Sequence, residues 1–120
     1  MYLFVYGTLK HGFRNDRLLC NSKFIGEFSV PGFKMLSLSG FPGLIKSEQN
    51  NRVLGEIYKI DDVTLSRCDY LEGYKPNKHK SSMYIRENLR VISEVGAWDC
   101  WVYLWNGSTD YPIIEDGIWR

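Results

Sequence analysis

Glu72 is the residue of this sequence whose surroundings best fit acid–base chemistry. It follows Leu71 and precedes Gly73-Tyr74, and an apolar flank of this kind removes water from a carboxyl group and raises its pKa toward that of a useful base. Asp69, one helical turn earlier, is expected to push the pKa of Glu72 in the same direction by like-charge repulsion. On spacing alone, Glu72 also fits an ordinary exposed residue at the end of a helix.

Glu56 is the second acidic candidate, because it shares one face of a predicted strand with Leu54 and Tyr58. The other interpretation of Glu56 is an edge-strand residue that points into water. The two histidines, His11 and His79, fall in predicted loops and provide no convincing Ser/His/Asp or Cys/His arrangement. The residue types therefore favour carboxylate chemistry.

A loop suited to a ligand follows the first predicted strand. Residues 2–6 are all aromatic or aliphatic, which is typical of a buried strand, and Gly7 follows at once. Without a Cβ, Gly7 lets the chain bend and lets another molecule approach the backbone N–H groups. The spacing of Gly7 and Gly12 fits neither a phosphate-binding loop nor a dinucleotide-binding loop. Taken alone, the pattern fits a plain strand-to-loop turn equally well.

One helix is predicted clearly, over residues 61–71, and Glu72 lies at its end. Asp61 or Asp62 can cap the first turn, and Gly73 stands where a helix is expected to stop. A carboxylate has the wrong sign for the C-terminal end of the helix dipole. Such a local mismatch often marks a functional site.

The rest of the pattern predicts an α+β, barrel-like single domain over residues 1–120, with about six strands around the one main helix. A short helical turn is predicted at residues 16–19. A hairpin loop is predicted at 47–52, between a short extended segment and a strong strand. The predicted strands and extended segments are 2–6, two strands within 24–38 that meet at Pro31-Gly32, 41–45, 53–60, 83–94 and 98–105.

Composition narrows the class of protein further. Fifteen basic and 14 acidic side chains give a net charge of +1, which argues against a nucleic-acid binder, and Lys75, Lys78 and Lys80 are better explained as a solvated loop. No apolar run is long enough for a membrane helix, and we expect no targeting segment before the first strand. The three cysteines are widely spaced, so no zinc site or disulfide framework is expected and a cytoplasmic location is favoured.

Two motifs carry a family resemblance when they are taken together: Tyr6-Gly7-Thr8-Leu9 and Leu71-Glu72-Gly73-Tyr74. Further matching segments follow in order along the chain: residues 41–44, 55–58 and 84–86, Ala97-Trp98 with Val102-Tyr103, and Gly117 with Trp119. Over nearly its full length, the sequence strongly resembles the gamma-glutamylcyclotransferase-like superfamily, and is most similar to its gamma-glutamylamine cyclotransferase branch.

The resemblance implies a small mixed β-barrel with one main helix and short peripheral helices. It implies that Tyr6, Gly7, Thr8 and Leu9 bind a gamma-glutamyl group through the backbone, that Tyr84 also contacts the substrate, and that Glu72 is the catalytic acid/base. The implied reaction closes the gamma-glutamyl group into 5-oxoproline and releases an amine or amino acid. It needs no metal or cofactor, and it leaves Glu56 a structural or supporting role.

Three segments depart from the family pattern. Asn15-Asp16 stands where relatives often have Asn-His, and Ile118 takes the place of an aspartate. Residues 75–82 form a lysine-rich stretch that is expected to reshape the leaving-group side. These departures put the identity of the substrate in doubt more than the chemistry.

Four functions remain open from the sequence. The first is a cyclotransferase for a gamma-glutamyl amine or amide, and the second is an enzyme that removes a gamma-glutamyl protecting group from a biosynthetic intermediate. The third is a non-catalytic module that binds a small anionic ligand with Gly7 and Glu72. The fourth is an interaction domain that uses the tryptophan-rich strand 98–105, which is better explained as core. The oligomeric state does not follow from the sequence.

Overall fold

The predicted helix and strands form in the computed structural model, which describes residues 1–120. In chain order the elements are β1 (Tyr2–Val5), η1 (Asp16–Leu19), β2 (Lys23–Pro31), β3 (Phe33–Ser37), β4 (Pro42–Lys46), β5 (Arg52–Lys59), α1 (Asp62–Leu71), η2 (His79–Ser81), β6 (Tyr84–Ser93), β7 (Gly96–Trp105) and β8 (Ile113–Ile114). The η elements are short 3₁₀ turns, so α1 is the one main helix, and the α+β class predicted from sequence is confirmed.

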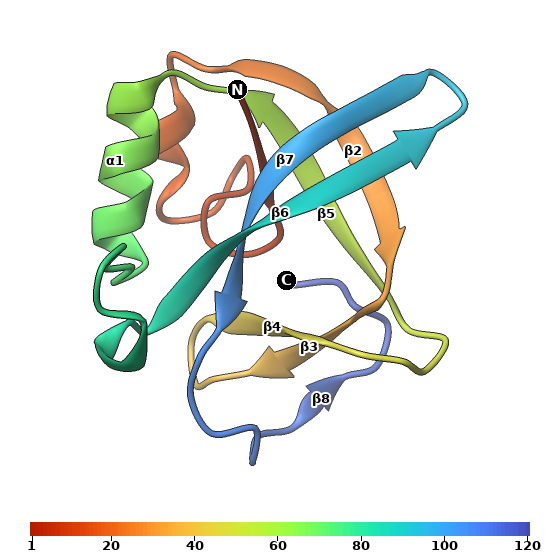
Figure 1. The fold of residues 1–120 in the computed structure, drawn as a ribbon. Helices are drawn as coiled ribbons and strands as arrows, with labels where there is room; N and C mark the ends of the chain where they lie inside the picture. Colours follow the sequence, from red (N-terminus) through yellow and green to blue (C-terminus); the bar gives the residue numbers. More distant parts are fainter.

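The strands form two sheets, and the larger one curls into a half-barrel (Figure 1). Five strands pair in the order β2-β5-β1-β7-β6, and three pair in the order β4-β3-β8. The pairing of β1 with β7 is parallel, whereas the other strand pairs are antiparallel. The large sheet is therefore mixed, as expected, and the small sheet is antiparallel.

β1 lies at the centre of the large sheet and is buried on both faces. Leu3 and Val5 pack into one apolar cluster, which includes Leu65 and Cys68 of α1. Phe4 packs on the other face, in a second cluster of similar size. This double burial is the physical reason for the unbroken apolar run at the start of the sequence. It also fixes the position of the loop that follows.

α1 begins where the sequence indicates. The Asp61 carboxylate accepts a hydrogen bond from the Thr64 backbone N–H at 2.8 Å, and this caps the first turn. Leu65 and Cys68 face the core. Figure 1 shows the helix against one end of the curled sheet, with its C-terminal end close to the start of β6.

Two details of the predicted fold are wrong. Residues 47–52 do not close a hairpin, because they carry the chain from β4 in the small sheet to β5 in the large sheet. A polar loop looks the same in sequence whether its flanking strands pair or not. β8 was not predicted, and the structure has more strands than the expected six or so. With only two residues, β8 has no periodicity to detect, and it forms only because β3 offers a free edge.

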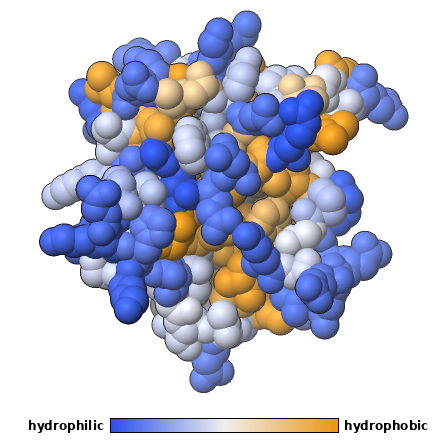
Figure 2. All heavy atoms as spheres, viewed as in Figure 1, coloured by the Kyte–Doolittle hydropathy of each residue, from blue (hydrophilic) through white to orange (hydrophobic).

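Figure 2 shows polar residues over much of one face, with apolar residues in a diagonal band between them. None of the helices combines the length and apolar character needed to cross a bilayer.

Candidate active site

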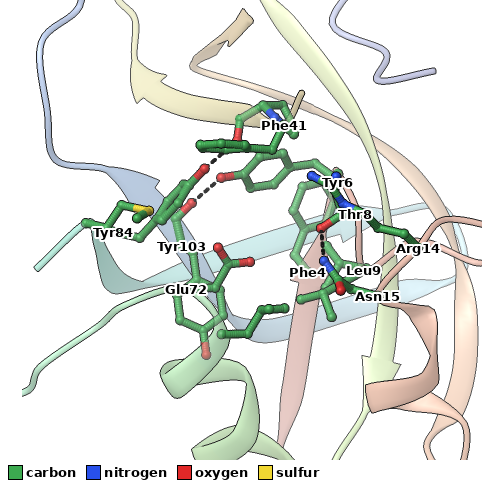
Figure 3. Close-up of a pocket in the computed structure, with 15 residues that line it drawn as sticks. Phe4, Tyr6, Thr8, Leu9, Arg14, Asn15, Phe41, Glu72, Tyr84 and Tyr103 are labelled. Carbon is green, nitrogen blue, oxygen red and sulfur yellow. Dashed lines mark hydrogen bonds between the residues drawn. The ribbon is translucent and has the colours of Figure 1, made fainter. Parts of the chain in front are cut away.

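A cavity of about 220 Å³ opens between the end of β1, the start of β4 and the C-terminal end of α1 (Figure 3). The fold brings together here segments that are far apart in the sequence. All the site residues predicted from sequence line this one cavity: Tyr6, Gly7, Thr8, Leu9, Glu72 and Tyr84.

Gly7 is needed because the chain of β4 passes directly over it. A Cβ at this position would lie 2.5 Å from Cγ of Pro42, which is far inside van der Waals contact. The Pro42 ring cannot swing away, since it is closed onto its own backbone. Any larger residue at position 7 would therefore move the cavity wall.

The loop after Gly7 is held by Asn15 and leaves its own N–H groups free. The Asn15 side chain donates to Thr8 Oγ1 at 2.8 Å, and the Asn15 backbone N–H donates to the Thr8 carbonyl at 2.9 Å. The backbone N–H groups of Gly7, Thr8 and Leu9 donate no hydrogen bond within the protein. Three consecutive free donors beside a cavity suit a carboxylate or a developing oxyanion.

Glu72 is positioned by the way α1 ends. The Tyr74 N–H donates to the Asp69 carbonyl and the Gly73 N–H donates to the Tyr70 carbonyl, which together form a Schellman motif. Gly73 has φ +64°, the left-handed conformation that this motif requires. The Gly73 carbonyl also accepts a hydrogen bond from the Met83 N–H at 3.0 Å. Glu72 is thereby fixed between the helix and β6.

The Glu72 carboxylate points into the cavity and makes no hydrogen bond to the protein (Figure 3). Glu72 is only partly exposed, and the loss of water around its carboxyl group raises its pKa from 4.5 to about 7. An acid of this strength exchanges protons readily at neutral pH. The arrangement can therefore take up and release a proton inside an apolar cavity.

Asp69 does not act on Glu72 in the way the sequence suggests. Its carboxylate accepts two hydrogen bonds from Arg86 Nη1, the shorter at 2.8 Å, and one from the Tyr103 hydroxyl at 2.7 Å. The Arg86 guanidinium compensates the charge of Asp69, and burial is the cause of the pKa shift at Glu72. The expected like-charge contribution of Asp69 is therefore wrong.

Tyr6 and Tyr84 contribute hydroxyl groups that stay protonated. The Tyr6 hydroxyl donates to the Tyr103 carbonyl and the Tyr84 hydroxyl donates to the Pro42 carbonyl, each at 2.6 Å. Burial raises the pKa of both phenols, and the negative charge of Glu72 raises each further. Neither tyrosine can therefore serve as a base at neutral pH.

Glu56 does not line this cavity, and its carboxylate binds the backbone of the loop after β1. Its Oε1 accepts hydrogen bonds from the His11 N–H at 2.9 Å and from the Tyr58 hydroxyl at 3.0 Å. Glu56 therefore ties the loop after β1 to β5. This placement agrees with the supporting role expected for it.

Of the residues in the segments that depart from the family pattern, only Asn15 lines the cavity, whereas Asp16 and residues 75–82 do not. The Asp16 carboxylate accepts the Gly12 N–H at 2.9 Å, so it stabilises a turn in which Gly12 has φ +87°. The lysine-rich stretch folds over Ser82, whose hydroxyl accepts the Lys75 N–H at 2.8 Å. Ile118 does not line the cavity.

Sequence reasoning missed several lining residues, namely Arg14, Asn15, Phe41, Met83 and Tyr103 as members of the site. Arg14 and Asn15 carried a usable signal, because they lie on the loop that begins with the predicted ligand-binding residues. Met83 and Tyr103 carried no such signal, since the sequence around each of them is typical of an ordinary strand. No three His, Cys, Asp or Glu side chains gather closely enough to hold a metal ion.

Comparison with known families agrees with this geometry. The family described as gamma-glutamyl cyclotransferase, AIG2-like, matches residues 3–120. This chain belongs to that family. The match spans both the loop after β1 and Glu72, so the AIG2-like family assignment rests on nearly the whole sequence rather than on one motif.

Individual relatives are similar over almost the whole chain. The gamma-glutamylcyclotransferase family protein YtfP of Escherichia coli K12 is 30% identical over 120 residues, which cover 99% of this chain and 96% of YtfP. The solution structure of Escherichia coli ytfP superposes with a TM-score of 0.74 at 31% identity, covering 99% of this chain and 96% of that one.

A third relative has a more specific name. The gamma-L-glutamyl-butirosin B gamma-glutamyl cyclotransferase of Niallia circulans is 31% identical over 119 residues, covering 98% of this chain and 74% of that enzyme. Together, the family and its members support gamma-glutamylcyclotransferase activity in general for this AIG2-like chain.

Proposed function

We propose that this protein releases 5-oxoproline from a gamma-glutamyl amide, with Glu72 as general acid/base. The observation that carries the proposal is the Glu72 carboxylate, which has no protein partner and a pKa of about 7. It shares its cavity with the free N–H groups of the loop after β1. Family membership supports the same reaction class.

In the proposed reaction, the α-amine nitrogen of the gamma-glutamyl group attacks its own γ-carbonyl carbon. A C–N bond forms to close a five-membered ring, and the C–N bond to the leaving amine breaks. The α-ammonium must first lose a proton, which the Glu72 carboxylate accepts, and the leaving nitrogen must gain one, which protonated Glu72 donates. The ammonium loses two protons in all to become a lactam N–H, and the released amine gains two to become an ammonium.

The remaining residues would hold the substrate in the reactive conformer. Nucleophile and electrophile belong to one molecule, so correct orientation alone can be worth an effective molarity of ~10⁵ M or more. The N–H groups of Gly7, Thr8 and Leu9 suit the α-carboxylate or the oxyanion that develops on the γ-carbonyl. The apolar wall around Glu72 excludes water, which keeps its pKa high.

A 5-oxoproline assay over a panel of gamma-glutamyl dipeptides and gamma-glutamyl amines tests this proposal. Glu72→Gln keeps the size of the side chain but cannot accept a proton, so we expect it to stay folded and to lose at least ~10²-fold in kcat/KM. Normal turnover by Glu72→Gln would exclude the mechanism. Tight binding of 5-oxoproline without product from any panel member would instead favour a non-catalytic binding module.

Removal of a gamma-glutamyl protecting group is a second version of the same chemistry. The similarity to the enzyme named for gamma-L-glutamyl-butirosin B favours including it. Bulky gamma-glutamylated amines in the substrate panel distinguish this version, because it requires that they react faster than small gamma-glutamyl amides.

A further inference from the structure

Arg14 is the one cationic side chain among the residues that line the active-site cavity. It is exposed, on the loop between β1 and η1, and its Nη2 donates to the Gly40 carbonyl at 2.8 Å. No carboxylate of the protein forms a salt bridge with it. A guanidinium has five N–H donors, so most of those of Arg14 are free for another molecule.

Both ends of the bridge from Arg14 to Gly40 are fixed by neighbouring hydrogen bonds. On one side, the Phe13 N–H donates to the Lys10 carbonyl at 3.0 Å, and the adjacent Asn15 is bound to Thr8. On the other side, the turn that contains Gly40 is closed by the bond from the Leu38 N–H to the Phe41 carbonyl at 2.9 Å. The guanidinium is therefore preorganised, and less entropy is lost when it binds an anion.

Arg14 lies at the exposed part of the cavity lining. The depth of the cavity is formed by buried residues such as Tyr6, Leu9 and Tyr103, which suit the constant gamma-glutamyl group. The mouth has partly exposed apolar walls, with Leu71 39% and Met83 48% exposed. Figure 3 shows Arg14 coming from the loop after β1, away from the helix end that supplies Glu72.

The balance of charge favours an anionic leaving group. A gamma-glutamyl amine carries one carboxylate and one ammonium, whereas a gamma-glutamyl amino acid carries a second carboxylate on its leaving group. Within the cavity, the loop N–H groups of residues 7–9 are free to bind one carboxylate. The guanidinium of Arg14 is then free to bind the other, as a charge-assisted hydrogen bond or bidentate pair.

We propose that Arg14 is a specificity-determining residue that binds the carboxylate of the leaving group. The preferred substrate is then a gamma-glutamyl amino acid rather than a gamma-glutamyl amine. This inference rests on the proposed cyclotransferase function, because it concerns the leaving group of that reaction.

The test uses two substrates that differ by one carboxylate, gamma-glutamyl-leucine and gamma-glutamyl-isopentylamine. We expect the wild type to prefer the leucine compound by at least about 10-fold in kcat/KM, which is typical of one hydrogen bond between charged groups. Arg14→Gln should abolish that preference by slowing the leucine substrate about 10-fold, while the amine substrate changes less than about 2-fold. Arg17→Gln is the matched control, because Arg17 is an exposed arginine nearby that does not line the active-site cavity.

Three results would overturn the inference. An equal loss on both substrates in Arg14→Gln would place Arg14 on the α-carboxylate. No preference in the wild type would mean that the protein does not bind the carboxylate of the leaving group. An equal effect of Arg17→Gln would mean that the preference comes from the positive charge of the surface and not from a contact with Arg14.

Calorimetric binding of the same two compounds to Glu72→Gln separates this inference from the proposed function. If Glu72→Gln binds the leucine compound more tightly and the added Arg14→Gln removes the difference, the carboxylate contact holds even where the wild type releases no 5-oxoproline. In that case the proposed function alone fails. If neither compound binds or reacts, both proposals fail.

Discussion

Glu72 illustrates how one residue acquires its chemistry from its surroundings. A carboxylate at the C-terminal end of a helix gains nothing from the helix dipole, and this one also has no hydrogen-bond donor from the protein. Burial then raises its pKa to about 7. The site therefore holds a group that is less stable in its ionised form than the same group would be in water, and the two predictions at this scale follow from that.

The first prediction concerns activity as a function of pH. If Glu72 must be ionised to accept a proton, kcat/KM should rise through an apparent pKa of about 7, and at two pH units below that value it should be ~10²-fold under the plateau. Initial rates of 5-oxoproline release between pH 5 and pH 9 measure this profile. A rise centred near the ordinary pKa of glutamate would contradict the assignment.

The second prediction concerns stability. The pKa of Glu72 is higher in the folded protein than its ordinary value of 4.5, so the neutral form favours folding. That contribution is fully present below pH 4.5 and is lost as the pH rises to about 7. Glutamine does not titrate, so Glu72→Gln should gain about 1–3 kcal/mol in free energy of unfolding relative to wild type between pH 4.5 and pH 8. Urea denaturation of both proteins at several pH values measures this gain. If the difference in free energy of unfolding between Glu72→Gln and wild type does not change with pH, the shifted pKa of Glu72 is refuted.

At the scale of elements, the end of α1 is anchored to the large sheet by one partly buried ion pair. Asp69 and Arg86 have side chains 17% and 16% exposed, and the Tyr103 hydroxyl of β7 completes the contact. The Arg86 guanidinium also stacks on Trp101, with its centre 4.4 Å from the ring centroid. This anchor lies directly before the motif that fixes Glu72, so it couples the sheet to the site.

Arg86→Gln should therefore be costly. The substitution leaves the Asp69 carboxylate largely buried without its cation, and we expect a loss of about 2–4 kcal/mol in free energy of unfolding. Arg90→Gln provides the matched control, since Arg90 pairs with Asp99 on the surface with side chains 59% and 73% exposed, and its loss should cost less than ~1 kcal/mol. Urea denaturation of both variants under the same conditions measures the two losses in free energy of unfolding. Equal losses would show that the Asp69–Arg86 pair stabilises the protein no more than a surface pair does.

At the scale of the whole molecule, the C-terminal residues join the loop after β1 to the sheet. Gly117 lies against the Arg52 backbone with φ +67°, and its carbonyl accepts the Leu54 N–H at 2.9 Å. The Trp119 carbonyl accepts a hydrogen bond from Lys10 Nζ at 2.9 Å. Lys10 is buried, and burial lowers its pKa. The last turn of the chain thus supplies the acceptor for a buried cation that lies next to the site loop.

Removal of residues 117–120 should destabilise the molecule and disturb the site together. Lys10 would lose its acceptor and the second core cluster would lose Trp119, so we expect a loss of at least about 2 kcal/mol. Arg120→Gln in the full-length chain is the control, because it removes a surface ion pair with Asp116 and keeps the Trp119 peptide carbonyl, and it should cost less than about 1 kcal/mol. Thermal melting and kcat/KM of the truncated chain and of Arg120→Gln check this, and a truncated chain as stable and active as wild type would contradict it.

The sequence by itself determined the local structure and the family. β1, α1 and the long strands have strong periodicity or capping residues, so their existence follows from short-range physics. The motif residues around Gly7 and Glu72 were sufficient to place the chain in the gamma-glutamyl cyclotransferase, AIG2-like family. What failed at this level was long-range pairing, as at residues 47–52 and at β8, because pairing depends on partners that no local pattern records.

Only the tertiary structure decided which of these residues meet and what their environment is. In the folded chain, Arg14 and Met83 line the cavity together with Glu72. Asp69 forms an ion pair with Arg86, so its charge is compensated and does not repel Glu72. It also set the pKa of Glu72. The physical reason is that burial and charge compensation are properties of the packed surroundings, and residues distant in sequence create those surroundings only when the chain has folded.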